Sequence, residues 1–476
     1  MVKWLTLIVY LIIMVAIGIY CRKKTSSVSE FVLGGRNLGA WFTAFAYGTS
    51  YFSAVVFIGY AGQFGWQYGV ASTWIGIGNA LIGTTLAWVV LGRRTRTMTQ
   101  HLEVKTMPEF FEKRYNSKKL KTFAELIVFV FLIPYTASVY NGLSRLFAMA
   151  FDIKFEYCII AMAVLTAVYV ILGGYMATAI NDFVQGLIML GGIGAVVIFV
   201  VHNQGGLTTA LKSLGNITDK GIPAQSLNSL FGPDPIGLLG VVILTSLGTW
   251  GLPQMVHKFY TIKDDKEIKT GTIISTVFAL VVSGGSYFMG GFGRLFVKAD
   301  SITSPGGKIA YDSIVPKMLD SAVPEILFGI VIVLVLSASM STLSSLVLTS
   351  SSTLTIDLIN PRVKNGMSDK KQVLCIRIFI AVFVILSVII AVNPNAYITT
   401  LMSISWGALA GSFLAPFMYG LFSKKITKQA VWVSFISGIS ITTLHMILFS
   451  LGWFPSLEDK VKSLNLGFNI LSPINI

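Results

Sequence analysis

Hydroxyl side chains concentrate in one long apolar segment, residues 326–356. The segment has 31 residues and no charged side chain, so it is long enough to span a bilayer as a helix. Its positions 337–355 carry twelve hydroxyls in nineteen residues. Because helical residues three and four apart share a face, Ser341, Ser344 and Ser345 can point the same way. Such neutral oxygens could bind a dehydrated Na⁺ beside a broken helix, or they could be hydrogen-bonded packing contacts between helices.

A single carboxylate interrupts another apolar stretch. Asp182 is the only charged residue between Tyr157 and Leu211. An ionisable group within a membrane span is costly, which makes it a candidate for ion binding or proton transfer. Alternatively, Asn181 and Asp182 could lie at the membrane interface and cap a helix. Position alone does not separate these two hypotheses.

Two further apolar segments contain residues that interrupt helices. Glycine weakens a helix, Thr and Ser compete for backbone hydrogen bonds, and proline removes one. The interrupting residues are Gly48, Thr49, Ser50, Gly59 and Gly62 in the first segment, and Gly248, Gly251 and Pro253 in the second. Each segment is the first of a set of five, a pattern typical of inverted repeats with a binding site near the membrane midplane. Ordinary proline kinks and glycine packing contacts are the alternative.

These segments belong to a chain whose composition is that of a polytopic membrane protein. It is 54% hydrophobic and 12% charged, whereas soluble domains carry roughly 25% charged residues. The three cysteines and four histidines show no spacing of a metal site or a disulfide framework. We expect an all-α fold with twelve spans, near residues 4–21, 40–64, 70–91, 123–150, 157–175, 180–201, 236–256, 271–293, 324–354, 373–392, 397–421 and 429–451.

The net charge of +15 follows from the distribution of Lys and Arg along these spans. With the N-terminus outside, the cytoplasmic connections hold 24 Lys and Arg, Lys258 among them, and the outer segments hold nine. The positive-inside rule therefore predicts this orientation, in a plasma (inner) membrane. It also explains the basic pI without a nucleic-acid partner. The chain ends without a basic stop, so we expect either a short tail or a truncated protein with a thirteenth span.

Several motifs, in a consistent order over nearly the whole length, resemble the sodium:solute symporter family. They are FVLGGRNLGAWF (31–42), TMPEFFEKRY (106–115), VYVILGGYMATAINDFVQG (168–186), WGLPQMVHKFYTIKD (250–264), GGFGR (290–294), SASMSTLSS (337–345) and SWGALAGSFLAPFMYGLF (405–422). The resemblance implies a LeuT-type fold of five-plus-five inverted repeats with an extra N-terminal helix. It implies one transporter domain over 1–476, with the extra helix at 4–21, repeats at 40–201 and 236–421, an accessory helix at 429–451 and a tail at 452–476.

The resemblance also implies where Na⁺, the coupling ion, binds. Site one would use the backbone carbonyls of Gly48, Tyr51 and Ala338 and the hydroxyls of Ser341 and Thr342. A second Na⁺, which some relatives bind, would use Asp182, Ser344 and Ser345. The family implies Na⁺-coupled uptake of a small organic solute by alternating access. Coupling to H⁺ through Asp182 and a transporter-like membrane sensor are the alternatives.

The substrate site is expected beside the two breaks. Its candidate residues are Phe52, Ser53, Tyr135, Thr249 and Trp250, although the aromatic rings among them could be packing residues. Proline-transporting relatives carry an acidic residue in place of Ser50 and an aromatic residue in place of Thr245, which weakens the case for proline. No acidic sugar-binding set is present. We therefore expect an amino acid or a monocarboxylate such as pantothenate, bound by a protein that is not an enzyme and functions as a monomer.

Overall fold

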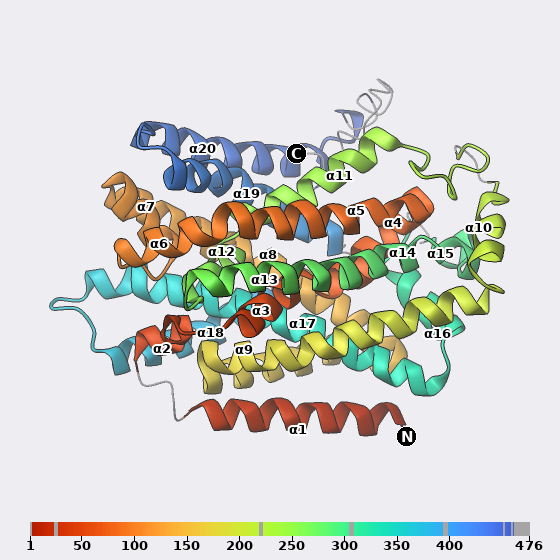
Figure 1. The fold of residues 1–476 in the computed structure, drawn as a ribbon, viewed down its shortest axis with the longest axis horizontal. Coiled ribbons are helices and arrows are strands. Elements are labelled where there is room, and N and C mark those ends of the chain that lie inside the picture. Colours follow the sequence, from red (N-terminus) through yellow and green to blue (C-terminus); the bar gives the residue numbers. More distant parts are fainter. Residues whose placement is uncertain are drawn as a thin grey trace.

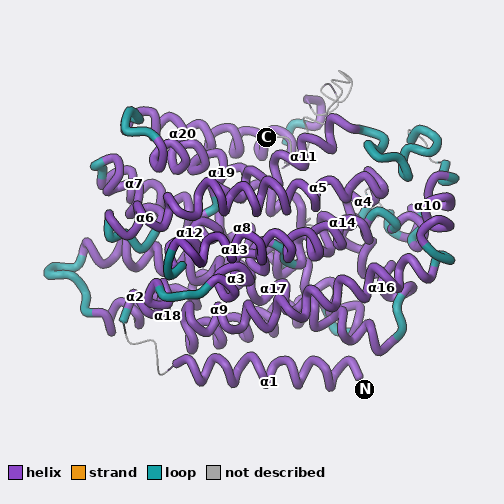
Figure 2. The backbone as a smooth tube through the Cα atoms, in the orientation of Figure 1, coloured by secondary structure: helices purple, strands orange, loops and turns teal. Residues whose placement is uncertain are grey.

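The computed structural model is a bundle of helices, most of whose long members run along the longest axis of the molecule (Figure 1). Figure 2 shows helices joined by loops, and no strand occurs in the described part of the chain. That part comprises residues 2–22, 27–218, 222–303, 309–393, 398–450, 453–457 and 460. The expected all-α fold is confirmed. Most of the expected tail at 452–476 lies outside the described residues.

The helices fall into two halves along the chain. The first half contains α1 (Val2–Arg22), α2 (Val28–Leu33), α3 (Ala40–Tyr51), η2 (Val55–Tyr60), α4 (Ala61–Tyr68), α5 (Thr73–Gly78), η4 (Asn79–Leu86), η5 (Trp88–Gly92), α6 (Arg93–His101), α7 (Met107–Tyr115), α8 (Lys118–Phe151), α9 (Phe155–Asn203) and α10 (Leu207–Gly215). The second half contains α11 (Pro235–Leu247), η6 (Gly248–Gly251), α12 (Pro253–Thr261), α13 (Asp265–Ala279), η7 (Leu280–Gly284), α14 (Gly285–Gly290), α15 (Gly293–Phe296), α16 (Ile314–Ala322), α17 (Glu325–Thr353), η10 (Leu354–Ile359), α18 (Asp369–Ala391), α19 (Ile398–Phe422), α20 (Lys428–His445) and η12 (Met446–Ser450).

The described residues contain nine helices that are long and apolar enough to cross a membrane, or ten when the bent pair Pro235–Gly251 and Pro253–Thr261 is counted as one span. Two of the nine, Val55–His101 and Phe155–Asn203, have 47 and 49 residues. Val55–His101 covers one of the twelve segments expected from the sequence and the end of another, and Phe155–Asn203 covers two of them. At about 1.5 Å per residue, a helix of this length is roughly twice as long as the ~30 Å hydrocarbon core. In the second of them, Gly174 has a positive φ of 56° and breaks the helix. The count of twelve stays a prediction.

The connections gather at the two ends of the bundle. The elements α2, α6 and α7, all assigned to the cytoplasmic side from the sequence, lie at the left in Figure 1, and α10, α15 and α16 lie at the right. This separation is what alternating crossings produce. Which end faces the cytoplasm stays a prediction.

The first expected break is present at the end of α3. Phe52 has an extended backbone (φ −108°, ψ 96°), and its N–H donates to the carbonyl of Gly48 at 3.1 Å. The Ser53 hydroxyl accepts from the N–H of Val55 at 3.2 Å and begins the next helical segment. Gly48 permits close packing here, because a Cβ atom at this position would lie 2.4 Å from the ring of Phe278.

The second expected break lies between η6 and α12, where the two parts of the span bend by 53°. Leu252 is extended (φ −82°, ψ 122°), and Pro253 occupies the first turn of α12, where its missing N–H costs no helical bond. The two broken spans touch each other, since the Tyr51 hydroxyl donates to the carbonyl of Thr245 at 2.5 Å.

The hydroxyl-rich helix α17 lies in the middle of the bundle. The most apolar part of its span is 89% buried, against 28% for the spans of α1 and α20. It packs against α8, α9 and α3. Its hydroxyls therefore face protein and not lipid, as a binding role requires.

Candidate functional site

The two helix breaks meet α17 at one place in the interior. Helix α17 packs on α3 and on α12, and α3 also packs on α12. A helix that ends inside the bundle leaves carbonyl groups without helical partners, and these must find other donors or a cation. The oxygen atoms gathered there form two neighbouring clusters.

The first oxygen cluster consists of the hydroxyls of Ser341 and Thr342 and the carbonyls of Thr49, Ser50 and Ala338. Ser341 Oγ donates to the carbonyls of Thr49 and Ala338, both at 3.0 Å. Thr342 Oγ1 lies 3.3 Å from the Thr49 and Ser50 carbonyls and 3.2 Å from that of Ala338. All five residues are buried.

This cluster has the chemistry of a Na⁺ site. All of its oxygens are neutral, and they come from hydroxyls, from the Ala338 carbonyl within α17 and from carbonyls beside the break of α3. Broken membrane helices bind Na⁺ through such carbonyls. A hydroxyl that now donates to a carbonyl can rotate so that its oxygen faces a cation. The carbonyls it reaches are those of Thr49 and Ser50, between the two expected positions Gly48 and Tyr51. The Gly48 carbonyl accepts from the N–H of Phe52.

The second oxygen cluster consists of the hydroxyls of Ser50 and Ser345 and the carboxylate of Asp182. It thus contains two of the three residues expected to bind a second Na⁺. Ser345 Oγ lies 2.8 Å from Ser50 Oγ, whereas the Ser344 hydroxyl donates to the carbonyl of Ser341 at 2.9 Å. Asp182 is completely buried, so it does not lie at an exposed interface. Its carboxylate lies 3.9 Å from the ammonium nitrogen of Lys258.

Lys258 is a site residue that the sequence reading missed. The charge distribution places it among the cytoplasmic loop cations, but in the structure Lys258 is buried on α12, with 1% of its surface exposed. Its Nζ donates to Ser345 Oγ at 2.8 Å and lies 5.2 Å from the centre of the Tyr175 ring. The sequence offers an indication of this position, because Lys258 lies only five residues after Pro253, on the broken span itself.

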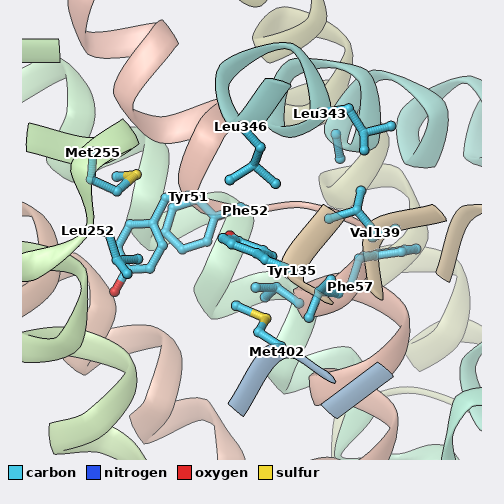
Figure 3. Close-up of a cluster of buried hydrophobic side chains, with 14 of the residues drawn as sticks. Tyr51, Phe52, Phe57, Tyr135, Val139, Leu252, Met255, Leu343, Leu346 and Met402 are labelled. Atoms are coloured by element: carbon cyan, nitrogen blue, oxygen red, sulfur yellow. The ribbon is translucent and has the colours of Figure 1, made fainter. Parts of the chain in front are cut away.

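Aromatic side chains pack around the first break. Phe52 stacks on Tyr51 with ring centroids 4.3 Å apart. Figure 3 shows these two rings in one buried cluster with Tyr135, Leu252 and Met255. Phe52 and Tyr135, two of the expected substrate residues, are thus brought together. Tyr135 also meets Trp406 edge to face at 6.1 Å.

The polar groups expected at the second break are engaged within the protein. The indole N–H of Trp250 donates to the carbonyl of Ile82 at 3.2 Å, and the Thr249 hydroxyl donates to the carbonyl of Ser246 at 2.8 Å. The cavity that Phe52 and Ser53 line has a volume of about 10 Å³, which is room for about one water molecule. A solute therefore needs side chains around the break to move.

The chain is similar to known proteins over most of its length. The model of the sodium:solute symporter family matches residues 31–438. The sodium/proline symporter of Staphylococcus aureus (strain JH9) is 31% identical over 454 residues, covering 92% of this chain and 85% of that protein. The osmoregulated proline transporter OpuE of Bacillus subtilis (strain 168) is 27% identical over 438 residues, covering 90% and 86%.

Solved structures show the same fold. A Na⁺-coupled sialic acid symporter, in a substrate-bound outward-open state, superposes with a TM-score of 0.72 at 17% identity, covering 94% of this chain and 98% of that one. A manganese transporter of Eremococcus coleocola superposes with a TM-score of 0.51 at 13% identity, with 92% of each chain covered. The LeuT-like fold that the motifs implied is confirmed.

Proposed function

Because this chain belongs to the sodium:solute symporter family, we propose that it couples the entry of Na⁺ to uptake of a small amino acid or monocarboxylate by alternating access. The family and the fold show that the protein is a multi-pass membrane transporter of a small solute, that Na⁺ is its coupling ion, and that it is not an enzyme. We propose in addition the substrate class and the binding residues. We also propose that the protein lies in the plasma membrane with its N-terminus outside and acts as a monomer.

The first oxygen cluster carries the proposal. We assign Na⁺ to the hydroxyls of Ser341 and Thr342, the carbonyl of Ala338 and the carbonyls at the end of α3. These groups come from both α17 and the broken helix, so a bound Na⁺ would hold the two together. A bound Na⁺ would also fix the end of α3, next to Phe52. Binding of the ion would therefore influence binding of a substrate beside Phe52, which is a physical route for coupling.

The aromatic cluster at the break supports a small substrate with an apolar body. Phe52 and Tyr135 supply apolar surface, while Ser53 and Thr249 supply hydroxyls near the two breaks. A polyhydroxylated sugar would lose water from several hydroxyls without enough replacement partners, at about 1–3 kcal/mol each. The relatives named as proline transporters support the amino-acid class. Ser50 and Thr245 depart from the residues expected for proline, so another small amino acid fits equally well.

Coupling to H⁺ is the alternative that the sequence leaves open, and the buried ionisable group of Asp182 is where it would act. Uptake by purified protein in proteoliposomes separates the two. We expect a panel of small amino acids and monocarboxylates to contain a solute that accumulates under an inward Na⁺ gradient at equal pH. Accumulation under a pH gradient without Na⁺ would contradict the proposal.

A further inference from the structure

Lys258 places a positive charge inside the second oxygen cluster. Its Nζ lies 2.8 Å from Ser345 Oγ and 3.9 Å from Asp182 Oδ2. Lys258 is 1% exposed and Asp182 is 0% exposed. A buried charge is costly unless an opposite charge and hydrogen bonds compensate it. Each of these two residues supplies the opposite charge for the other, and Ser345 accepts a hydrogen bond from Lys258.

The ammonium group also begins a chain of hydrogen bonds. A lysine ammonium can only donate, so Ser345 Oγ accepts from it and can give its own proton to Ser50 Oγ at 2.8 Å. The carbonyl of Ser50 belongs to the first oxygen cluster, where Thr342 Oγ1 reaches it at 3.3 Å. The chain therefore links α12, α17 and α3 and ends at the candidate Na⁺ site.

An ammonium group and a Na⁺ carry the same charge, and here both would contact the same oxygen atoms. Asp182 and Ser345 are two of the three residues expected to bind a second Na⁺, and Lys258 already faces both. Placing two cations against one buried carboxylate would leave a net positive charge in a medium of low dielectric constant, which is strongly unfavourable. The single negative charge of Asp182 balances one monovalent cation.

We propose that Lys258 is a built-in substitute for a second Na⁺, so that this symporter binds a single Na⁺ in each cycle, at the first oxygen cluster. The proposal rests on the function proposed above. In it, Lys258 is a positioning residue: its fixed charge neutralises Asp182, and its hydrogen bond to Ser345, which in turn bonds Ser50, holds both hydroxyls beside the ion site.

The test is the number of Na⁺ ions bound, measured with ²²Na⁺ on purified full-length protein in detergent, which needs no knowledge of the substrate. The wild type should bind one Na⁺ per protein. Lys258→Met removes the charge and keeps much of the side-chain length, so the freed Asp182 and Ser345 should bind a second Na⁺. Lys258→Arg, which keeps the charge, and Asp182→Asn/Lys258→Met, which removes the carboxylate as well, should both return the number to one.

Several results would overturn the assignment. Two Na⁺ in the wild type, or one in a folded Lys258→Met protein, would show that the ammonium does not take the place of an ion. If Lys258→Met does not fold, Ser341→Ala/Thr342→Ala in the wild-type background decides: it should bind Na⁺ at least about tenfold more weakly, and one Na⁺ bound with wild-type affinity would reveal a second site. A wild type that binds no Na⁺ contradicts the proposed coupling as well, whereas two Na⁺ contradict only the role of Lys258.

Discussion

The hydroxyl of Ser341 donates to the carbonyl of Thr49 across 3.0 Å, although 292 residues separate the two in the chain. This bond joins the hydroxyl-rich helix α17 to the last turn of the broken helix α3. It brings a hydroxyl oxygen and a carbonyl oxygen, both neutral, into direct contact.

Replacing both Ser341 and Thr342 with Ala should raise the Na⁺ concentration for half-maximal transport at least about tenfold, or roughly 1.4 kcal/mol. The change removes two neutral ligands and alters no charge. Na⁺-dependent uptake in proteoliposomes measures it. Ser339→Ala is the matched control. Ser339 lies on the same helix, but its hydroxyl donates to the carbonyl of Val335 at 2.7 Å and is not part of the first oxygen cluster. An unchanged Na⁺ dependence in the folded double variant would reject the site.

Asp182→Asn should destabilise the protein by about 3–5 kcal/mol, because it leaves the buried ammonium of Lys258 without its counter-charge. Asp182→Asn/Lys258→Met should recover much of this loss, since neither charge then remains. Thermal unfolding of the purified protein in detergent, analysed as a double-mutant cycle, gives the coupling between the two residues. Additive effects would mean that the two charges do not stabilise each other.

Phe52→Ser should weaken binding of the natural substrate and relax selectivity towards larger polar solutes. The ring fills space beside Tyr51 and offers no hydrogen bond, so its removal opens a polar gap at the break. Competition against Na⁺-dependent uptake by a panel of solutes is the measurement. Phe52→Leu keeps an apolar side chain and should keep the order of preference. If glucose, galactose or sialic acid competes best in the wild type, the pocket assignment is wrong.

Single cysteines test the orientation. In a variant whose three native cysteines are replaced, Lys118→Cys at the start of α8 should resist an impermeant thiol reagent on intact cells, and Ala224→Cys should react. Both native side chains are exposed at their ends of the bundle, so accessibility itself is not limiting. Permeabilised cells, in which both positions should react, are the control. Labelling at 118 but not at 224 would invert the topology.

The sequence by itself determined the features that depend on local pattern. The length of the apolar runs predicted the helices, Gly48 and Pro253 marked the two breaks, and the spacing of Ser341, Ser344 and Ser345 predicted hydroxyls on one helix face. These features follow from backbone preferences and helical periodicity, which act over a few residues. For the same reason, the motifs could imply the family before any contact was known.

Only the tertiary structure decided which groups meet. The pattern around Lys258 is the same whether the residue ends a span or points into the bundle, and the 53° bend before α12 is what turns it towards Asp182 and Ser345. Likewise, the carbonyls of Thr49 and Ser50 became partners of Thr342 because α3 ends against α17. Such pairings depend on the angles and distances at which separate helices pack, and no local pattern in the chain records them.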